Sequence, residues 1–186
     1  MLYTTQSTIA QNTVIRVAAI VSFTLLTALG ARLSIPNQPV PFTFQVMVVL
    51  LAGLVLGPRD GFASQVLYLL AIAGGAPLDA NGLGAAALSG PTAGYLYSFP
   101  IAAMAAGFLA IRQSVLVRWI AAMVGVGVIY VLGATYLKQY LGISWARAYE
   151  LGVEPFILFD VLKALMAATL AESGRYWLMR FGNNAQ

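Results

Sequence analysis

The segment Pro155–Ala171, PFILFDVLKALMAATLA, decides how this chain folds. It is apolar and has the length of a helix that enters a bilayer, yet Asp160 and Lys163 lie near its start. Two residues three positions apart share one face of a helix. If the helix starts at Pro155, Asp160 lies about 7 Å below that start. An ionisable residue at such a depth must be paired or must face a cavity.

Two interpretations of this pair follow from the sequence. In the first, Asp160 and Lys163 form a structural ion pair between helices, or Lys163 extends its ammonium group to the interface. In the second, the pair belongs to a half-buried binding site for a ligand that carries both hydrogen-bond donors and acceptors. The choice between these interpretations depends on which other parts of the chain lie on the same side of the membrane as Asp160 and Lys163.

The composition is that of an integral membrane protein. Of the 186 residues, 60% are hydrophobic and only 9% are charged, and the mean hydropathy is +0.83, whereas soluble domains carry about 25% charged residues. The length suits one membrane domain covering residues 1–186. No nucleotide-binding loop motif occurs, so we expect that the chain does not hydrolyse ATP by itself.

The residue inventory excludes several classes of site. The sequence has no Cys and no His, which excludes disulfides, Cys/His zinc sites and every nucleophile–His pair. The net charge is +4, but the basic residues stand singly at segment ends, which is a signal of membrane topology and not a nucleic-acid-binding surface. We therefore expect no metal, no cofactor and no nucleic acid.

Apolar runs predict an all-α integral membrane protein, a six-transmembrane-helix bundle with long outward loops after the first and third helices. A short amphipathic piece within 138–154 is expected to lie along the surface. The expected membrane spans are approximately residues 14–33, 42–56, 61–74, 95–111, 119–137 and 155–177.

Three unusual features are predicted to share the outer side. They are the proline-rich segment Ser34–Gln45, the Gly/Ala-rich loop Gly75–Gly94 and the start of the sixth span. The other side would hold six basic residues against three, which places it and both termini in the cytoplasm of a cell (plasma) membrane protein. The six are Arg16, Arg59, Arg112, Arg118, Arg175 and Arg180, and the three are Arg32, Lys138 and Arg147.

Several motifs follow one another along the chain, namely PVPFTFQ at 39–45, followed by LLAGLVLGPRDG, then GPTAGY at 90–95 and DVLK at 160–163. Together they resemble the motifs of the BioY family, the substrate-binding (S) components of energy-coupling-factor (ECF) biotin transporters. The resemblance runs from about Ala28 to Ala171. The family often has Pro-Gly before the aspartate, where this chain has Leu158-Phe159.

The resemblance implies a six-helix bundle whose outward loops cover a biotin site. By position, Asp160 and Lys163 match the polar pair that contacts the ligand, and Asn81 matches a further polar contact. Gln45 and Tyr95 are additional candidates. The resemblance also implies partners, namely a transmembrane coupling protein and two ABC-type ATPases.

Members of the family bind the coupling protein through small residues of the first helix. The candidate pairs in this chain are Ala18/Ser22 and Thr27/Ala31. The competing interpretation is that these small residues pack inside the bundle.

The chemistry of biotin suits these residue types. A buried ureido ring needs an acceptor such as Asp160 for its N–H groups, and donors such as Asn81 or Lys163 for its carbonyl. Lys163 could instead pair with the ligand carboxylate, and the sequence leaves both open. Phe42, Phe44 and Tyr95 are candidates for an apolar wall, with lipid or core packing as the alternative.

Three other functions compete with this interpretation. An ion-coupled carrier would use Asp160 as a proton or sodium site, but no second half of the chain repeats the first. An S component for another vitamin would share the architecture. A Ser–Lys hydrolase would need Ser89 or Ser98 beside Lys163, without a supporting motif. We therefore predict a transport protein that is not an enzyme.

Overall fold

The protein is all-α, as expected, in a computed structural model that describes residues 13–110 and 114–183, with side chains up to 174. Within these ranges there are seven α-helices, whereas the sequence predicted six membrane-spanning helices and a short surface segment. The extra helix, α7, is the short amphipathic segment. The α-helices are α2 (Thr13–Arg32), α3 (Gln45–Leu56), α4 (Pro58–Ala73), α5 (Ala93–Leu109), α6 (Val115–Leu141), α7 (Trp145–Gly152) and α8 (Ile157–Asn183).

Short elements occupy the connections. Strands β1 (Ser34–Ile35) and β2 (Phe42–Thr43) pair antiparallel after α2, and the 3₁₀ helices are η1 (Gly84–Ser89) and η2 (Glu154–Phe156). The long connections after the first and third long helices therefore contain some regular structure.

Glycine and proline set the boundary between α3 and α4. Gly57 has a φ of 83°, a value that favours glycine, and Pro58 occupies the first turn of α4. Arg59 and Asp60 consequently belong to this first helical turn, although the expected spans 42–56 and 61–74 left them between two helices. The Arg16 guanidinium donates to both carboxylate oxygens of Asp60, and this ion pair joins the starts of α2 and α4.

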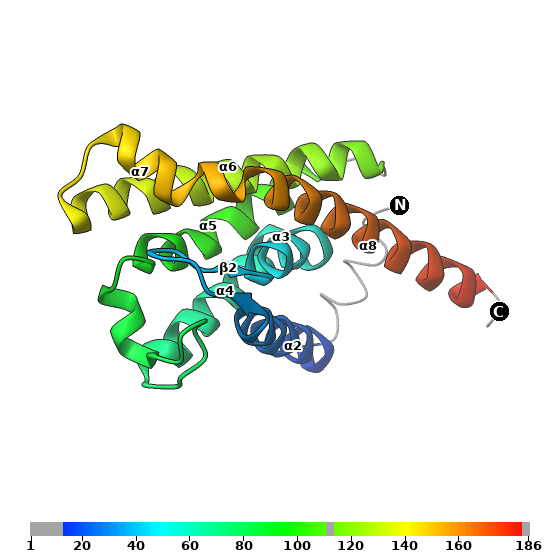
Figure 1. The fold of residues 1–186 in the computed structure, drawn as a ribbon. Coiled ribbons are helices and arrows are strands. Elements are labelled where there is room, and N and C mark those ends of the chain that lie inside the picture. Colours follow the sequence, from blue (N-terminus) through cyan, green and yellow to red (C-terminus); the bar gives the residue numbers. More distant parts are fainter. Residues whose placement is uncertain (1–12, 111–113, 184–186) are drawn as a thin grey trace.

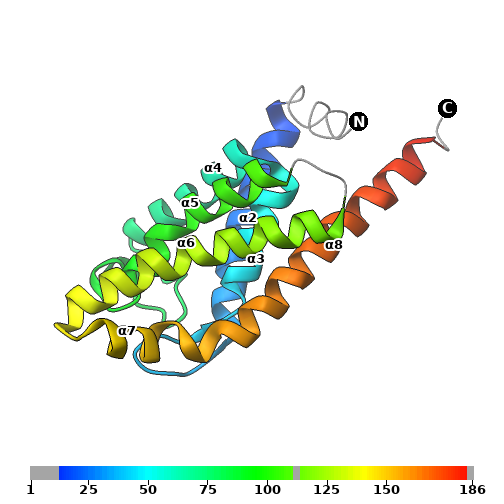
Figure 2. The same ribbon diagram turned by 90° about the horizontal axis from the view of Figure 1, so that it is seen from above.

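Helix α5 lies at the centre of the bundle. It packs against α3, α4 and α6, while α8 crosses α3 and α6, and α2 packs on α3 and α4 (Figures 1 and 2). Small residues permit these close approaches. A Cβ added at Gly53 would lie 2.0 Å from the Ala103 carbonyl oxygen, and one at Gly107 would lie 2.6 Å from the Pro58 nitrogen.

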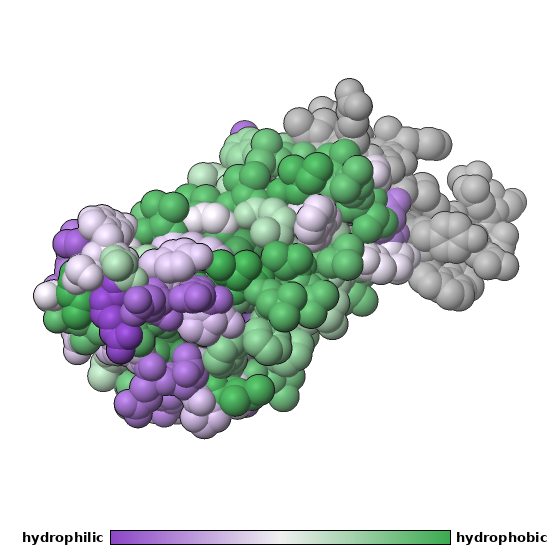
Figure 3. Space-filling model, turned by 45° about the horizontal axis from the view of Figure 1, so that its top comes forward, coloured by the Kyte–Doolittle hydropathy of each residue, from purple (hydrophilic) through white to green (hydrophobic). Residues whose placement is uncertain are grey.

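The outer surfaces of the long helices are apolar. Exposed large hydrophobic side chains occur along α2, α5, α6 and α8, and by length and composition α2 and α6 are each able to cross a membrane. Figure 3 shows hydrophobic side chains over the body of the molecule and hydrophilic ones gathered at one end. This distribution is typical of a protein surrounded by lipid.

Three connecting segments meet at one end of the molecule. They are the β1–β2 segment, the connection with η1, and the α7–η2 segment, and they lie opposite to the start of α2 and the end of α8 (Figures 1 and 2). Farther from this end, α3, α5, α6 and α8 are joined by a tightly packed core of Leu50, Leu54, Ala106, Ala121, Ala122, Val126, Ala164, Ala167 and Ala171.

Candidate binding site

A cavity lies at the end where the three segments meet, and the cavity together with its open mouth holds about 620 Å³ of space not occupied by atoms. Its wall combines residues from the connecting segments with residues from α3, α5, α6 and α8. The lining consists of Val40, Pro41, Thr43, Gln45, Val46, Asp79, Ala80, Asn81, Thr92, Tyr95, Leu96, Phe99, Ile129, Tyr130, Gly152, Phe156, Asp160 and Lys163.

Asp160 is the centre of the polar part of the wall. It is 2% exposed, and its Oδ1 accepts a hydrogen bond from Lys163 Nζ at 2.8 Å. Its Oδ2 accepts another from the Tyr130 hydroxyl, also at 2.8 Å. Each carboxylate oxygen can accept two hydrogen bonds. One position on each oxygen is therefore left for a ligand that donates.

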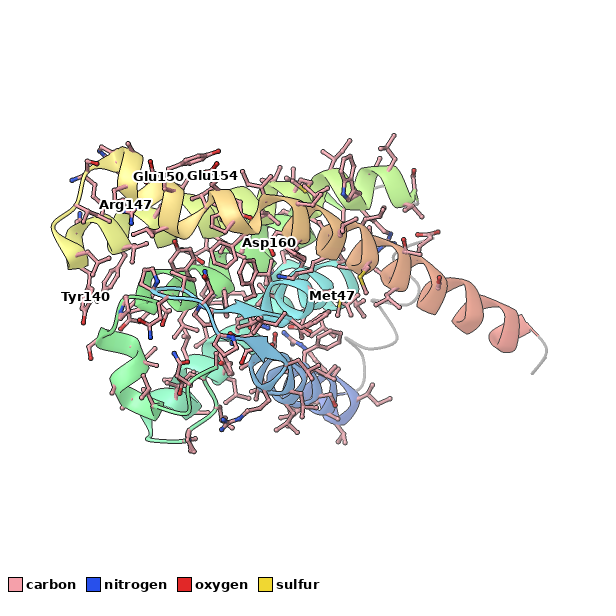
Figure 4. All side chains as sticks on the ribbon, in the orientation of Figure 1. Met47, Tyr140, Arg147, Glu150, Glu154 and Asp160 are labelled. Carbon is pink, nitrogen blue, oxygen red and sulfur yellow. The ribbon has the colours of Figure 1, made fainter. Side chains whose placement is uncertain are left out.

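The start of α8 differs from our expectation. The helix begins at Ile157 and follows η2, so Asp160 is its fourth residue and lies about 5 Å along its axis, less deep than expected. A carboxylate in the first turn is stabilised by the positive end of the helix dipole. Figure 4 shows Asp160 on the inner side of α8, whereas Arg147 and Glu150 lie around α7.

Gln45 is held by a tyrosine behind the wall. It is the first residue of α3, and its Nε2 donates to the Tyr68 hydroxyl at 2.6 Å. This bond uses one of the two N–H groups of the amide, so Gln45 retains its amide oxygen as an acceptor for a ligand N–H and its second N–H as a donor.

Asn81 comes from the connection between α4 and η1. Its side chain is exposed and lines the cavity, so it belongs to the mouth. The buried carboxylate of Asp79 shapes this turn, because it accepts the backbone N–H of Asn81 at 3.0 Å and that of Gly84 at 2.8 Å.

Tyr95 forms part of the wall between three elements. Its ring packs on Gly133 of α6, where an added Cβ would lie 2.2 Å from the ring. Its hydroxyl donates to the carbonyl of Gly152 at the end of α7, at 2.9 Å. Tyr95 thereby fixes α7 against the bundle.

The structure brings five of the six candidate residues to one cavity, namely Asp160, Lys163, Asn81, Tyr95 and Gln45. Phe42 is the exception, since it does not line the cavity but packs on Phe156 and Phe159 with ring centroids 4.5 and 5.3 Å apart. Phe44, at the N-cap of α3, is also outside the lining.

Tyr130 was missed by sequence reasoning. It lies 30 positions before Asp160, on α6, and a single tyrosine in an apolar helix carries no signal that separates a site residue from an interface anchor. Only the packing of α6 against α8 reveals the contact.

Two further sequence proposals can be placed. Ser89 and Ser98 donate their hydroxyls to backbone carbonyls and do not line the cavity, so neither is positioned for a Ser–Lys dyad with Lys163. Of the small residues of α2, Ala18 and Ser22 are exposed, whereas Thr27 and Ala31 are fully buried inside the bundle.

Comparison with known proteins assigns the family. The family model described as "BioY family" matches residues 4–180. The chain belongs to the BioY family. A "Probable biotin transporter BioY" of Pyrococcus horikoshii is 41% identical over 157 residues, which cover 84% of this chain and 93% of that protein. The "Biotin transporter BioY" of Thermotoga maritima is 41% identical over 151 residues, covering 80% and 89%.

The fold agrees with this family. A crystal structure described as the S-component for biotin from an ECF-type ABC transporter superimposes with a TM-score of 0.81 at 25% identity, covering 88% of this chain and 92% of that one. As a BioY family member, the chain is a membrane transport protein and not an enzyme.

Proposed function

We propose that this chain binds biotin in the cavity at the loop end and serves as the substrate-binding subunit of a biotin uptake transporter. The observation that carries the proposal is the Tyr130–Asp160–Lys163 group beside an otherwise apolar wall, in a chain of the BioY family. Biotin has a matching division, with a polar ureido ring, an apolar thioether ring and a carboxylate tail.

The contacts suggest roles for individual residues. Asp160 accepts a ureido N–H, Gln45 offers its amide oxygen to a second donor, and Lys163 and Asn81 donate. Leu96, Phe99, Ile129 and Phe156 bury the thioether ring, as apolar side chains do in small-molecule sites.

The arrangement in the membrane extends the proposal. Residues 1–186 form a single membrane domain in the cell membrane, in which six long helices span the bilayer and α7 lies at the outer surface. The cavity faces outward and both termini are cytoplasmic, as the excess of basic residues at the opposite end indicates. A transmembrane coupling protein and two ABC-type ATPases supply the energy, since the sequence has no motif for ATP hydrolysis.

Titration calorimetry of the purified, ligand-stripped protein tests the binding function. We expect tight binding of biotin by the natural protein, and affinities at least about tenfold lower in Asp160→Asn and Lys163→Ala. The absence of binding by folded natural protein would contradict the biotin proposal, and the same titration with other vitamins or with sodium would then identify the rival. Unchanged affinity in both variants would make the pair structural only.

Biotin methyl ester decides which end of the ligand Lys163 contacts. If the ammonium group pairs with the ligand carboxylate, Lys163→Ala weakens the binding of biotin but leaves that of the ester unchanged. If Lys163 serves the ureido carbonyl, the variant weakens both ligands by the same factor.

A further inference from the structure

Tyr68 occupies a central position behind the cavity wall. It belongs to α4 and is fully buried, and it is absent from the cavity lining. Its ring stacks on Phe99, with centroids 6.5 Å apart and planes at 24°. Phe99 itself lines the cavity. Tyr68 is therefore one layer removed from any ligand.

The hydroxyl of Tyr68 joins two parts of the site. It accepts the hydrogen bond from Gln45 Nε2 at 2.6 Å and donates to the backbone carbonyl of Leu78 at 3.1 Å. A tyrosine hydroxyl can accept and donate at the same time. Without this oxygen, a buried amide and a backbone carbonyl would each lose a partner, which is unfavourable away from water.

Leu78 belongs to the segment that carries Asn81. We call residues 76–84 the Asn81 loop. Its interior is shaped by Asp79 and by Gly82 and Gly84, whose φ values are 69° and 58°. Two adjacent backbone carbonyls attach the loop to the bundle. The Pro77 carbonyl accepts a hydrogen bond from Arg32 of α2, and the Leu78 carbonyl accepts one from Tyr68.

We propose that Tyr68 is a positioning residue for ligand binding. Its single hydroxyl holds both the Asn81 loop and the Gln45 amide in the positions from which they contact the ligand. The inference rests on the proposed function, because it assigns Asn81 and Gln45 to the ligand. A displaced Asn81 loop opens the mouth of the cavity, so loss of the hydroxyl acts mainly on the rate at which ligand leaves.

The variant Tyr68→Phe tests this with the ring retained. We expect its biotin affinity to fall about tenfold, as for the loss of a buried hydrogen-bond partner, with most of the change in the dissociation rate. Tyr97→Phe is the matched control. Its hydroxyl also donates to a backbone carbonyl, that of Leu88 in η1 at 2.7 Å, but Tyr97 is exposed and does not line the cavity. An equal loss in both variants would overturn the inference.

A double-variant cycle separates positioning from packing. If Tyr68 acts through Asn81, then Tyr68→Phe weakens binding less in an Asn81→Ala background than in the natural protein. Full additivity would show that Tyr68 acts independently of this loop and would overturn the inference.

Amide hydrogen exchange of the ligand-free protein gives a readout that needs no biotin. We expect the Asn81 and Gly84 amides to exchange faster in Tyr68→Phe, and to be unchanged in Tyr97→Phe. Unchanged exchange in Tyr68→Phe would overturn the inference, whereas altered exchange in a protein that never bound biotin would contradict only the proposed function. If Tyr68→Phe does not fold, Arg32→Ala removes the other contact that attaches the Asn81 loop to the bundle, from outside the cavity lining, and an unaltered biotin affinity there would overturn the inference.

Discussion

Tyr130 and Asp160 meet across the boundary between α6 and α8, where the tyrosine hydroxyl donates to the carboxylate oxygen that Lys163 leaves free. The carboxylate is thereby fixed from two sides. A carboxylate held in one orientation presents its remaining acceptor positions to a ligand without first losing rotational freedom.

Removal of this hydroxyl is expected to weaken binding. Tyr130→Phe should lower the affinity for biotin about tenfold, because Asp160 loses one of the two contacts that orient it. Tyr136→Phe on the same helix is the control, since Tyr136 does not line the cavity. Calorimetric titration of both variants measures the difference, and equal affinities would contradict an orienting role for Tyr130.

The ion pair predicts an asymmetry in stability. Lys163→Met leaves the buried Asp160 carboxylate without its cation, which typically costs about 3–5 kcal/mol. The double variant Asp160→Asn/Lys163→Met removes both charges and should be the more stable of the two. Unfolding free energies in detergent compare them. If the double variant is the less stable one, the unpaired Asp160 carboxylate is not the cause of the stability lost in Lys163→Met.

A single added methyl group should displace Tyr95. In Gly133→Ala the new Cβ would lie 2.2 Å from the Tyr95 ring, so the ring has to move out of the cavity wall. We expect a loss of about 1–3 kcal/mol in unfolding free energy, as is usual for overpacking, together with weaker biotin binding.

Gly127→Ala is the control for this substitution, because it lies on the same helix and its Cβ would meet no atom within 4 Å. It should leave biotin binding unchanged and should not lower the unfolding free energy, because alanine is favoured over glycine inside a helix by about 0.5–1 kcal/mol. Similar effects of the two substitutions would show that helix α6 tolerates no alanine in general, and that Tyr95 is not the cause.

The opposite end of the bundle should govern stability without affecting binding. Arg118 of α6 is 2% exposed, pairs with Glu172 of α8 at 2.9 Å and donates to the Leu54 carbonyl of α3. Arg118→Met should lower the unfolding free energy by about 3 kcal/mol, since it removes the buried guanidinium group that pairs with Glu172 and donates to the Leu54 carbonyl. The biotin affinity of the folded variant should not change.

An exposed ion pair provides the comparison for Arg118. Arg147 pairs with Glu150 at 2.8 Å on α7, where both side chains are at least half exposed. Arg147→Met should therefore cost at most about 1 kcal/mol. A larger loss in Arg147→Met than in Arg118→Met would reverse the assigned importance of the two pairs.

The sequence predicted those parts of the site that depend on local geometry. Asp160 and Lys163 are on one helix, so their spacing alone placed them together. Phe42 was misplaced because it lies in a two-residue strand, where successive side chains point to opposite faces. Thr43 lines the cavity while Phe42 packs on η2 and α8, and hydropathy does not reveal which of two neighbours faces inward.

Helix ends were predicted less well than helices. The apolar run from Phe42 suggested a helix from that residue, but the strand pairing of Phe42 and Thr43 with β1 delays α3 until Gln45. Likewise Val115–Arg118 extends α6 before the expected start at 119. In both cases the tertiary partner of the segment decides, and that partner is distant in the sequence.

The packed core of α3, α5, α6 and α8 limits the route by which a ligand can leave the cavity. Leu50, Ala122, Val126 and Ala164 are at most 2% exposed and lie between the cavity and the opposite end. Within the part of the chain that the structure describes, this core closes the cavity toward the opposite end. A ligand in the cavity therefore leaves on the side of the connecting segments, and its delivery to the other compartment requires that this side of the subunit be presented there.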